Sequence, residues 1–455
     1  MLQTRVRLED DLAVVNELAE RPATTAQELA ANLTRIYETV RSVGLERYDL
    51  AEVAGSVPRL LPAIFAMRLK LRDQVAGWHA RGFMSLPVQK AVRDTLRAGR
   101  YATDMLGELN LGYIQLGTGE VTKRAFSGGD FNTLVNPKFD TGHDIPFQAG
   151  DLLLMRGMHH NSAAIARIGD VDSQFSHVGI VHTDEAGKQW VVEALIEEGS
   201  VIKPLEHDLS HGLGRCVVFR HKDAAFARNA AAQIHELVRR SNAPGGKRIW
   251  YDFTMELQGD KELFCSKLVR LAYRLASADS VLLPAFPTRF DMKNRDFMNR
   301  IGVTARETFA PADVELESDF DVVAEWQDYR VTSRLRLQDL LMDKLFQWMD
   351  EYGYTFHPDF PIRLIGIFGR MSSRFSERTK AMVAEVIPRV PPNMRRSAIQ
   401  AVAMLHQTAE PLLGELIQQE CASIERRGRP LQSFEVFDYL EQRRQDLNGR
   451  IGYLS

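Results

Sequence analysis

A cysteine in the middle of the chain has the surroundings of a nucleophile. Cys265, in Glu-Leu-Phe-Cys-Ser-Lys-Leu-Val, falls in the predicted first turn of an amphipathic helix. Unpaired backbone N–H groups and the positive end of the helix dipole stabilise a thiolate there, and the same groups can hold an oxyanion. The alternative interpretation, a small buried apolar residue, is the commoner fate of a free cysteine.

A histidine and a carboxylate on two neighbouring predicted strands supply the other groups of a catalytic triad. His177 lies in Gln-Phe-Ser-His-Val-Gly-Ile-Val and Glu193 in Trp-Val-Val-Glu-Ala-Leu, with a turn signal, Asp184–Gly187, between them. Folding the hairpin about that turn sets position 177 opposite position 193, within one residue, and opposed Cβ atoms lie about 5 Å apart. The carboxylate would then orient the ring and stabilise imidazolium. A cross-strand pair that serves structure alone is the alternative.

The elements that must position these residues form an α+β region. Short β-type segments alternate with turns from near Ile145 to about Arg220, and a helix follows at 223–239. The cysteine helix is expected at 264–275 and a late strand at 320–326. The five earlier strands are expected at Asp151–Met155, Phe175–His182, Trp190–Leu195, Ser200–Pro204 and Cys216–Arg220.

Helical regions flank this middle part. The arrangement predicts three units, 1–140, 141–330 and 331–455. In the first unit, prolines are expected to separate several helices, and a glycine-rich connection, 117–142, leads to the middle. The prolines are Pro22, Pro58, Pro62 and Pro87. In the last unit, helices are predicted from Ser333 and at about 373–387, 393–421 and 431–447.

Five motifs in a particular order resemble a known family. They are Gly150-Asp-Leu-Leu-Leu154, Phe175-Ser-His-Val-Gly-Ile-Val181, Val192-Glu-Ala194, Trp250-Tyr-Asp-Phe253 and Phe264-Cys-Ser-Lys-Leu-Val269. Because the histidine precedes the cysteine, the chain resembles the circularly permuted NlpC-type papain-like cysteine hydrolases, the YiiX/YebB-like group. The lecithin:retinol acyltransferase-like enzymes share this permuted order. The resemblance covers roughly 145–330. It implies a permuted papain-like domain with a small antiparallel sheet and a catalytic helix.

The resemblance also implies roles for single residues. Cys265 is expected to be the nucleophile, His177 the general base and then acid, and Glu193 the residue that orients the ring. Tyr251 is similar to a substrate-side residue whose phenol can donate a hydrogen bond near the oxyanion; an aromatic packing residue is an equal alternative. The chain departs from the pattern at Lys267, where relatives often carry glutamate, and we expect this lysine to add positive charge near the thiolate.

Composition and the remaining motifs exclude several other classes. A net charge of -3 over 455 residues gives no indication of nucleic-acid binding, and 45% hydrophobic with 26% charged residues is ordinary for a globular protein. The three cysteines form no CxxC pair, and no cofactor or metal is expected. His159 and His160 fall in a predicted loop, where a metal-ligand pair is one interpretation and a solvated loop the simpler one. His207 and His211 have i, i+4 spacing but lack the glutamate of an HExxH motif.

These features predict acyl chemistry and leave the substrate open. The first hypothesis is an acyl hydrolase or acyltransferase that acts on lipid-like substrates, and the second is an amidase or peptidase that cleaves peptidoglycan stem peptides or other amides. The third is a non-catalytic binding scaffold. Leu60–Leu71 can touch a membrane surface, although a core helix is the simpler interpretation. The helical flanks can bind a protein partner. Without a signal peptide or a spanning segment, the default location is the cytoplasm, with signal-independent export as the alternative.

Overall fold

A computed structural model gives the fold of the chain. It describes residues 6–42, 44–113, 124–127, 131–140, 142, 145–210, 212–363 and 390–455. The helix expected at about 373–387, His211 and most of the glycine-rich connection lie outside these residues.

One seven-stranded antiparallel sheet forms the centre of the molecule, with strand order β1-β9-β6-β2-β3-β4-β5. The strands are β1 (Thr133–Val135), β2 (Leu152–Gly157), β3 (His177–Thr183), β4 (Gln189–Leu195), β5 (Gly199–Pro204), β6 (Leu213–His221) and β9 (Phe320–Gln327). All six predicted strands are present, with ends shifted by a few residues. The seventh, β1, was not predicted, because it comes from the stretch interpreted as a loop; it pairs with β9. A small second sheet joins β7 (Thr288–Arg289) to β8 (Glu307–Thr308).

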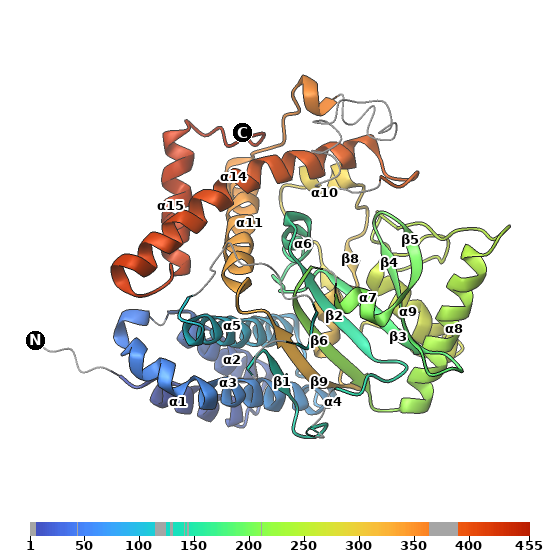
Figure 1. Cartoon of the computed structure of the whole chain (residues 1–455), viewed down its shortest axis with the longest axis horizontal. Coiled ribbons are helices and arrows are strands. Elements are labelled where there is room, and N and C mark those ends of the chain that lie inside the picture. Colours follow the sequence, from blue (N-terminus) through green and yellow to red (C-terminus); the bar gives the residue numbers. More distant parts are fainter. Residues whose placement is uncertain are drawn as a thin grey trace, which may run out of the picture.

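Each face of the sheet is covered by different elements. Helices α8 (Ala224–Asn242) and α9 (Cys265–Ala276) contact β3 and β4 on one face, and Figure 1 shows them beside that end of the sheet. The apolar side of α9 is buried, apart from Leu275, which was expected on that side and is exposed. On the other face, a smaller core packs under α7 (Leu205–Leu209) and the segment around Ala125.

The N-terminal helices form a layer beside the β1 edge of the sheet (Figure 1). They are α1 (Leu8–Glu20), α2 (Ala26–Ser42), α3 (Leu50–Asp73), α4 (Val75–Ala80) and α5 (Leu86–Asn110). Pro22 and Pro87 lie at helix boundaries, as predicted. The prediction was wrong for Pro58 and Pro62, because α3 continues through both. Burial of α3 against α1 and α5 stabilises the helix despite the lost backbone hydrogen bonds.

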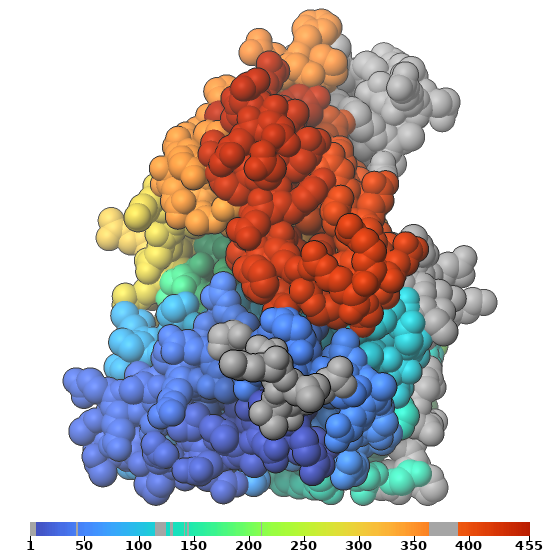
Figure 2. All heavy atoms as spheres, turned by 90° about the vertical axis from the view of Figure 1, so that its left-hand side faces the viewer, coloured from blue at the N-terminus to red at the C-terminus, as the bar shows by residue number. Residues whose placement is uncertain are grey.

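The C-terminal helices lie on top of the N-terminal helices. They are α11 (Thr332–Tyr352), α14 (Arg396–Arg427) and α15 (Ser433–Asp446), close to the predicted ranges. Figure 2 shows this region resting directly on the N-terminal layer. At this junction, Arg336 of α11 donates to Glu108 of α5 at 3.1 Å and to Glu420 of α14 at 2.6 Å.

Buried ion pairs also join the N-terminal helices to the sheet. Glu325 of β9 accepts two hydrogen bonds from Arg68 of α3, at 2.7 and 2.9 Å, and one from Arg100 of α5 at 3.1 Å. All three side chains are almost fully buried. A charge buried without its partner is very unfavourable, so these pairs fix how the helices sit on the sheet.

One helical stretch, Leu50–Ala80, is long and apolar enough to cross a membrane by length and composition. In this structure α3 packs between other helices, and Arg68 and Arg72 are buried among polar partners from residues 314–325. These contacts are those of a core helix. Contact of Leu60–Leu71 with a membrane surface therefore stays a prediction.

Candidate active site

The structure brings His177 and Glu193 into direct contact. Nε2 of His177 lies 2.6 Å from Oε2 of Glu193, which is 3% exposed. The predicted register was wrong by two residues, because β3 and β4 pair Ile180 with Val192 and Val181 with Val191. His177 and Glu193 are therefore diagonal neighbours on the same face, within reach of a long side chain. The alternation of the strands placed both side chains on one face, which a slip of two residues does not change.

Gly179 makes room for this diagonal contact. Continuing the observed register puts Gly179 opposite Glu193, between the carboxylate and the imidazole. A Cβ at position 179 would lie 2.6 Å from Cγ1 of Val191 and 3.6 Å from Cβ of Glu193. The missing side chain thus allows β4 to approach β3 closely and lets Glu193 reach along the strand to His177.

Cys265 is the first residue of α9 and lies against His177. The side chain is buried, and the helix start has no side-chain cap among the described residues. Burial raises the pKa of the thiol, but a hydrogen bond to His177 and the charge of the imidazole outweigh it, so the pKa falls below its ordinary value. Because Nε2 is engaged by Glu193, Nδ1 is the ring nitrogen that remains for Cys265.

The pKa of His177 is shifted in the opposite direction from that of Cys265. Burial lowers the pKa of His177, whereas the hydrogen bonds to Cys265 and Glu193 and their negative charges hold it well above the ordinary value. Opposite shifts of this kind favour a thiolate–imidazolium pair. The other two cysteines differ, since burial raises the pKa of both Cys216 and Cys421.

Tyr251 lies in the same pocket as Cys265, with Phe264 and Phe175 in its walls. Burial first, and then the charge of Cys265, raise the pKa of the phenol well above its ordinary range. The hydroxyl is therefore protonated and can act as a hydrogen-bond donor. Its ring also packs on Phe253, with ring centroids 5.3 Å apart, so the substrate-side and packing interpretations are both compatible with this position.

Lys267 does not face the thiolate, contrary to our expectation. Its ammonium donates to Oδ2 of Asp252 at 2.6 Å and to the carbonyl of Gln258 at 2.8 Å, and the side chain is buried. Asp252 belongs to the Trp-Tyr-Asp-Phe motif. The lysine thus ties the segment that carries Tyr251 to the helix that carries Cys265, because a buried ammonium requires a carboxylate partner.

The opposite wall of the catalytic pocket comes from outside the five motifs. Arg93, Arg97 and Arg100 of α5 line it, at spacings that place them on one side of a helix. Arg100 donates to Glu315 at 2.6 Å and to Gln174 at 3.1 Å, and its guanidinium lies 4.7 Å from the ring centroid of Phe175. These arginines were not predicted from the sequence. The i, i+4, i+7 spacing of three arginines was the available signal, but their partners are too distant in sequence to be identified.

A second cluster of polar side chains lies apart from this pocket. His160 is buried at the start of α6 (His160–Ile165), so its placement in a solvated loop was wrong, and its Nε2 lies 2.7 Å from Glu410. His406 is the third member, with all three potential ligand atoms within 4.8 Å. Arg334 also donates to Glu410, at 3.3 Å, and already neutralises the carboxylate. His207 contacts Asp208 at 3.2 Å.

The fold and the geometry around Cys265 define a papain-like hydrolase domain with a permuted order of motifs. A family model described as permuted papain-like amidase enzyme, YaeF/YiiX, C92 family, matches residues 146–319. The match confirms the expected resemblance and covers the sheet strands β2 to β6, the helix α9 and the pocket walls built from residues 165–175, 251–266 and 288–315. No curated protein matches the chain.

Proposed function

We propose that the chain is a cysteine-dependent acyl hydrolase or acyltransferase with Cys265 as nucleophile, His177 as base and acid, and Glu193 as the residue that holds the ring. The observation that carries this proposal is the contact of Cys265 with His177, with the pKa of the thiol lowered and that of the imidazole raised. A structural cysteine needs no lowered pKa, and burial raises the pKa of Cys216.

The reaction proceeds in two steps. The Cys265 thiolate attacks the carbonyl carbon of an ester or amide, and the bond to the leaving oxygen or nitrogen breaks as Nδ1 of His177 gives its proton to that atom. Water, or another acceptor, then loses a proton to His177 and attacks the thioester, which releases the acyl group and restores the thiolate. Backbone N–H groups at the start of α9, which has no side-chain cap within the described part of the chain, would stabilise the oxyanion, and the Tyr251 hydroxyl would be a further donor.

Lipid-like acyl groups are the preferred substrates in this proposal. Aromatic side chains form one part of the pocket around Cys265, namely Tyr251, Phe264, Phe175, Phe290 and Phe309, and arginines of α5 line the opposite wall. The aromatic part supports an apolar acyl group beside the reacting carbonyl. The description of the matching family as amidases favours the second candidate, cleavage of peptide amides such as peptidoglycan stems. The two candidates share the same thioester chemistry.

One experiment separates the candidates. Wild type and Cys265→Ala are incubated with phospholipid vesicles and with muropeptides, and the products are identified by mass spectrometry. Cysteine-dependent release of fatty acid supports the lipid-like substrate, and cleaved stem peptides support the amidase. Conversion of neither, together with failure of Cys265 to react with iodoacetamide at neutral pH, contradicts the enzyme and supports the third hypothesis, a binding scaffold.

A further inference from the structure

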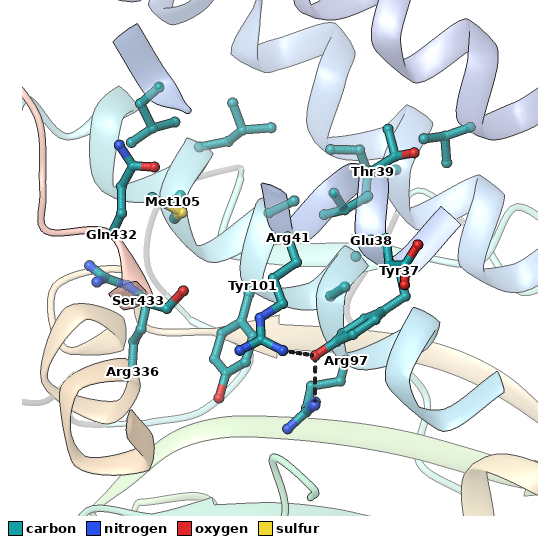
Figure 3. A pocket seen from close by; sticks show the side chains of 18 of the residues that line it. Tyr37, Glu38, Thr39, Arg41, Arg97, Tyr101, Met105, Arg336, Gln432 and Ser433 are labelled. Atoms are coloured by element: carbon teal, nitrogen blue, oxygen red, sulfur yellow. Dashed lines mark hydrogen bonds between the residues drawn. The ribbon is translucent and has the colours of Figure 1, made fainter. Parts of the chain in front are cut away.

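A large cavity lies among the helical flanks, and one of its lining residues, Asp172, comes from the part of the chain that the family model matches. It measures about 700 Å³ and lies between the N-terminal helices on one side and residues of α11, the 430–433 segment and α15 on the other. Figure 3 shows it from close by, with Gln432, Ser433 and Arg336 on the side opposite Tyr37. Its volume is in the range of sites that bury a ligand, which run from about 300 to 1,000 Å³.

Most of the cavity wall is aliphatic. The apolar side chains come from α1, α3 and α5 and include Leu12, Leu60, Ile64, Met67, Ala102 and Met105. Three of them belong to the stretch Leu60–Leu71, so part of the apolar face of α3 lines this space. The aliphatic part of the wall favours the apolar part of an occupant, because water gains few hydrogen bonds there.

Polar groups lie on more than one side of the cavity, and those around Tyr37 form a hydrogen-bonded group. The hydroxyl of Tyr37 accepts from Arg41 at 3.1 Å and from Arg97 at 3.4 Å, as the dashed lines of Figure 3 show. Arg97 is further held by Asp94 at 3.0 Å and by Asp172 at 2.8 Å. The side around Tyr37 therefore offers fixed hydrogen-bond donors to the polar end of a molecule whose remainder is apolar.

The side of the cavity around Tyr37 and Arg97 is also the partition between the cavity and the catalytic pocket. Arg97 and Asp172 line both spaces. The space beside Cys265 measures only about 60 Å³, too little for a substrate larger than a few atoms. Room for a larger acyl group exists directly behind the Arg97–Asp172 ion pair. The side chain of Asp172 is 36% exposed, so the two charged groups can separate while the carboxylate stays in contact with water.

We propose that the cavity holds the apolar chain of a long-chain acyl substrate, whose carbonyl end reaches Cys265 past the Arg97–Asp172 ion pair. The inference rests on the proposed function and adds to it a chain-binding site built by the helical flanks. The aliphatic wall takes the hydrocarbon tail, and the donors around Tyr37 lie at the end nearest the reacting carbonyl.

Filling the cavity tests the proposal. Ala102→Trp places an indole in the cavity, and Ala31→Trp, on the exposed side of α2, is the matched control. We measure kcat/KM for the acetyl and dodecanoyl esters of p-nitrophenol. Ala102→Trp is expected to lower the value for dodecanoyl by about 10-fold or more and to leave acetyl unchanged, since the tail loses its space. Equal values for both enzymes, or equal losses on both esters, overturn the proposal.

Direct binding separates this proposal from the proposed function. In the Cys265→Ala protein, cis-parinaric acid is titrated and its fluorescence recorded, again with and without Ala102→Trp. Loss of binding in the filled variant supports the chain site even if no ester is cleaved, whereas equal binding overturns it even if Cys265 is catalytic. Met105→Trp, a smaller increase in volume in the same cavity, replaces Ala102→Trp if thermal melting shows that the latter does not fold.

Discussion

The catalytic pocket has two walls of different origin. One wall carries Cys265 and Tyr251, with His177 in contact with the cysteine, and all three come from the part of the chain that the family model matches. The other carries the arginines of α5, which lie before residue 146 and are held by carboxylates such as Glu315 and Glu325. The reacting groups are thus encoded by short local motifs, while the shape of the pocket depends on pairs of residues far apart in the chain. Variants on the first wall should change the rate of acyl transfer, and variants on the second wall should change the free energy of unfolding.

The largest effect is expected from Glu193→Gln. The amide keeps the size of the side chain but cannot stabilise imidazolium, so the rate of acyl transfer should fall by about 10²- to 10⁴-fold. The rate is measured under single-turnover conditions on the best ester substrate. Glu185→Gln, in the exposed turn of the same hairpin, is the control and should match wild type. A full rate for Glu193→Gln would limit this carboxylate to a structural role.

A change on the second wall should act on stability. Arg100→Leu leaves Glu315 and Glu325 with less compensation in a buried site, and breaking such a pair costs about 3–5 kcal/mol. The urea midpoint, followed by tryptophan fluorescence, should fall clearly. Arg21→Leu removes an exposed pair with Glu17 and should shift the midpoint very little. Equal midpoints for the two variants would contradict the role assigned to the buried pairs.

A smaller effect is expected from Gly179→Ala. The new Cβ would meet Val191 at 2.6 Å, so β4 must move away from β3 and Glu193 from His177. Displacement of a catalytic group by about 1 Å lowers the rate by about 10²-fold, and a partial displacement lowers it less. Gly414→Ala, on a helix with open space around it, is the matched control. The measurement is the same single-turnover rate, and a Gly179→Ala enzyme as fast as the control would show that the hairpin tolerates a side chain there.

The smallest effect concerns pH. Because the pKa of Cys265 is lowered, its alkylation by iodoacetamide should rise with a midpoint below about 8.5, the value of a free cysteine. Glu193→Gln weakens the imidazolium, which removes positive charge from beside the thiolate, so the midpoint should move upward. Peptide mass spectrometry resolves each site, with Cys421 as an internal reference whose pKa is raised. A midpoint that does not move would mean that Glu193 leaves the thiolate unaffected.

The reacting groups could be predicted from the sequence more completely than the pocket around them. Alternation in the strands and the start of an amphipathic helix were enough to bring Cys265, His177 and Glu193 to one place, and an error of two residues in register did no harm. The direction of Lys267 was not predictable, because its partner Asp252 lies on an irregular segment. The arginines of α5 were missed for a similar reason: Arg100 and Glu325 are 225 residues apart.

The flanking helices show how packing overrides local preference. Pro58 and Pro62 indicated helix ends, but the apolar face of α3 is buried along its length and the helix continues. β1 has only three residues, too few for a periodic pattern, and its pairing with β9 depends on the whole sheet. The positions of α11 and α14 were predicted closely, because each helix is long enough to show a periodic apolar pattern.

The pairing of Arg68 and Arg100 with Glu325 has a consequence for how the protein is made. Arg68 precedes Glu325 by 257 residues, so at about 5–20 residues per second the ribosome needs roughly 10–50 s to deliver the carboxylate. During that time the nascent helices hold arginines whose final, buried positions are unfavourable without their partner. We therefore expect the N-terminal layer to reach its native packing only after β9 has been synthesised.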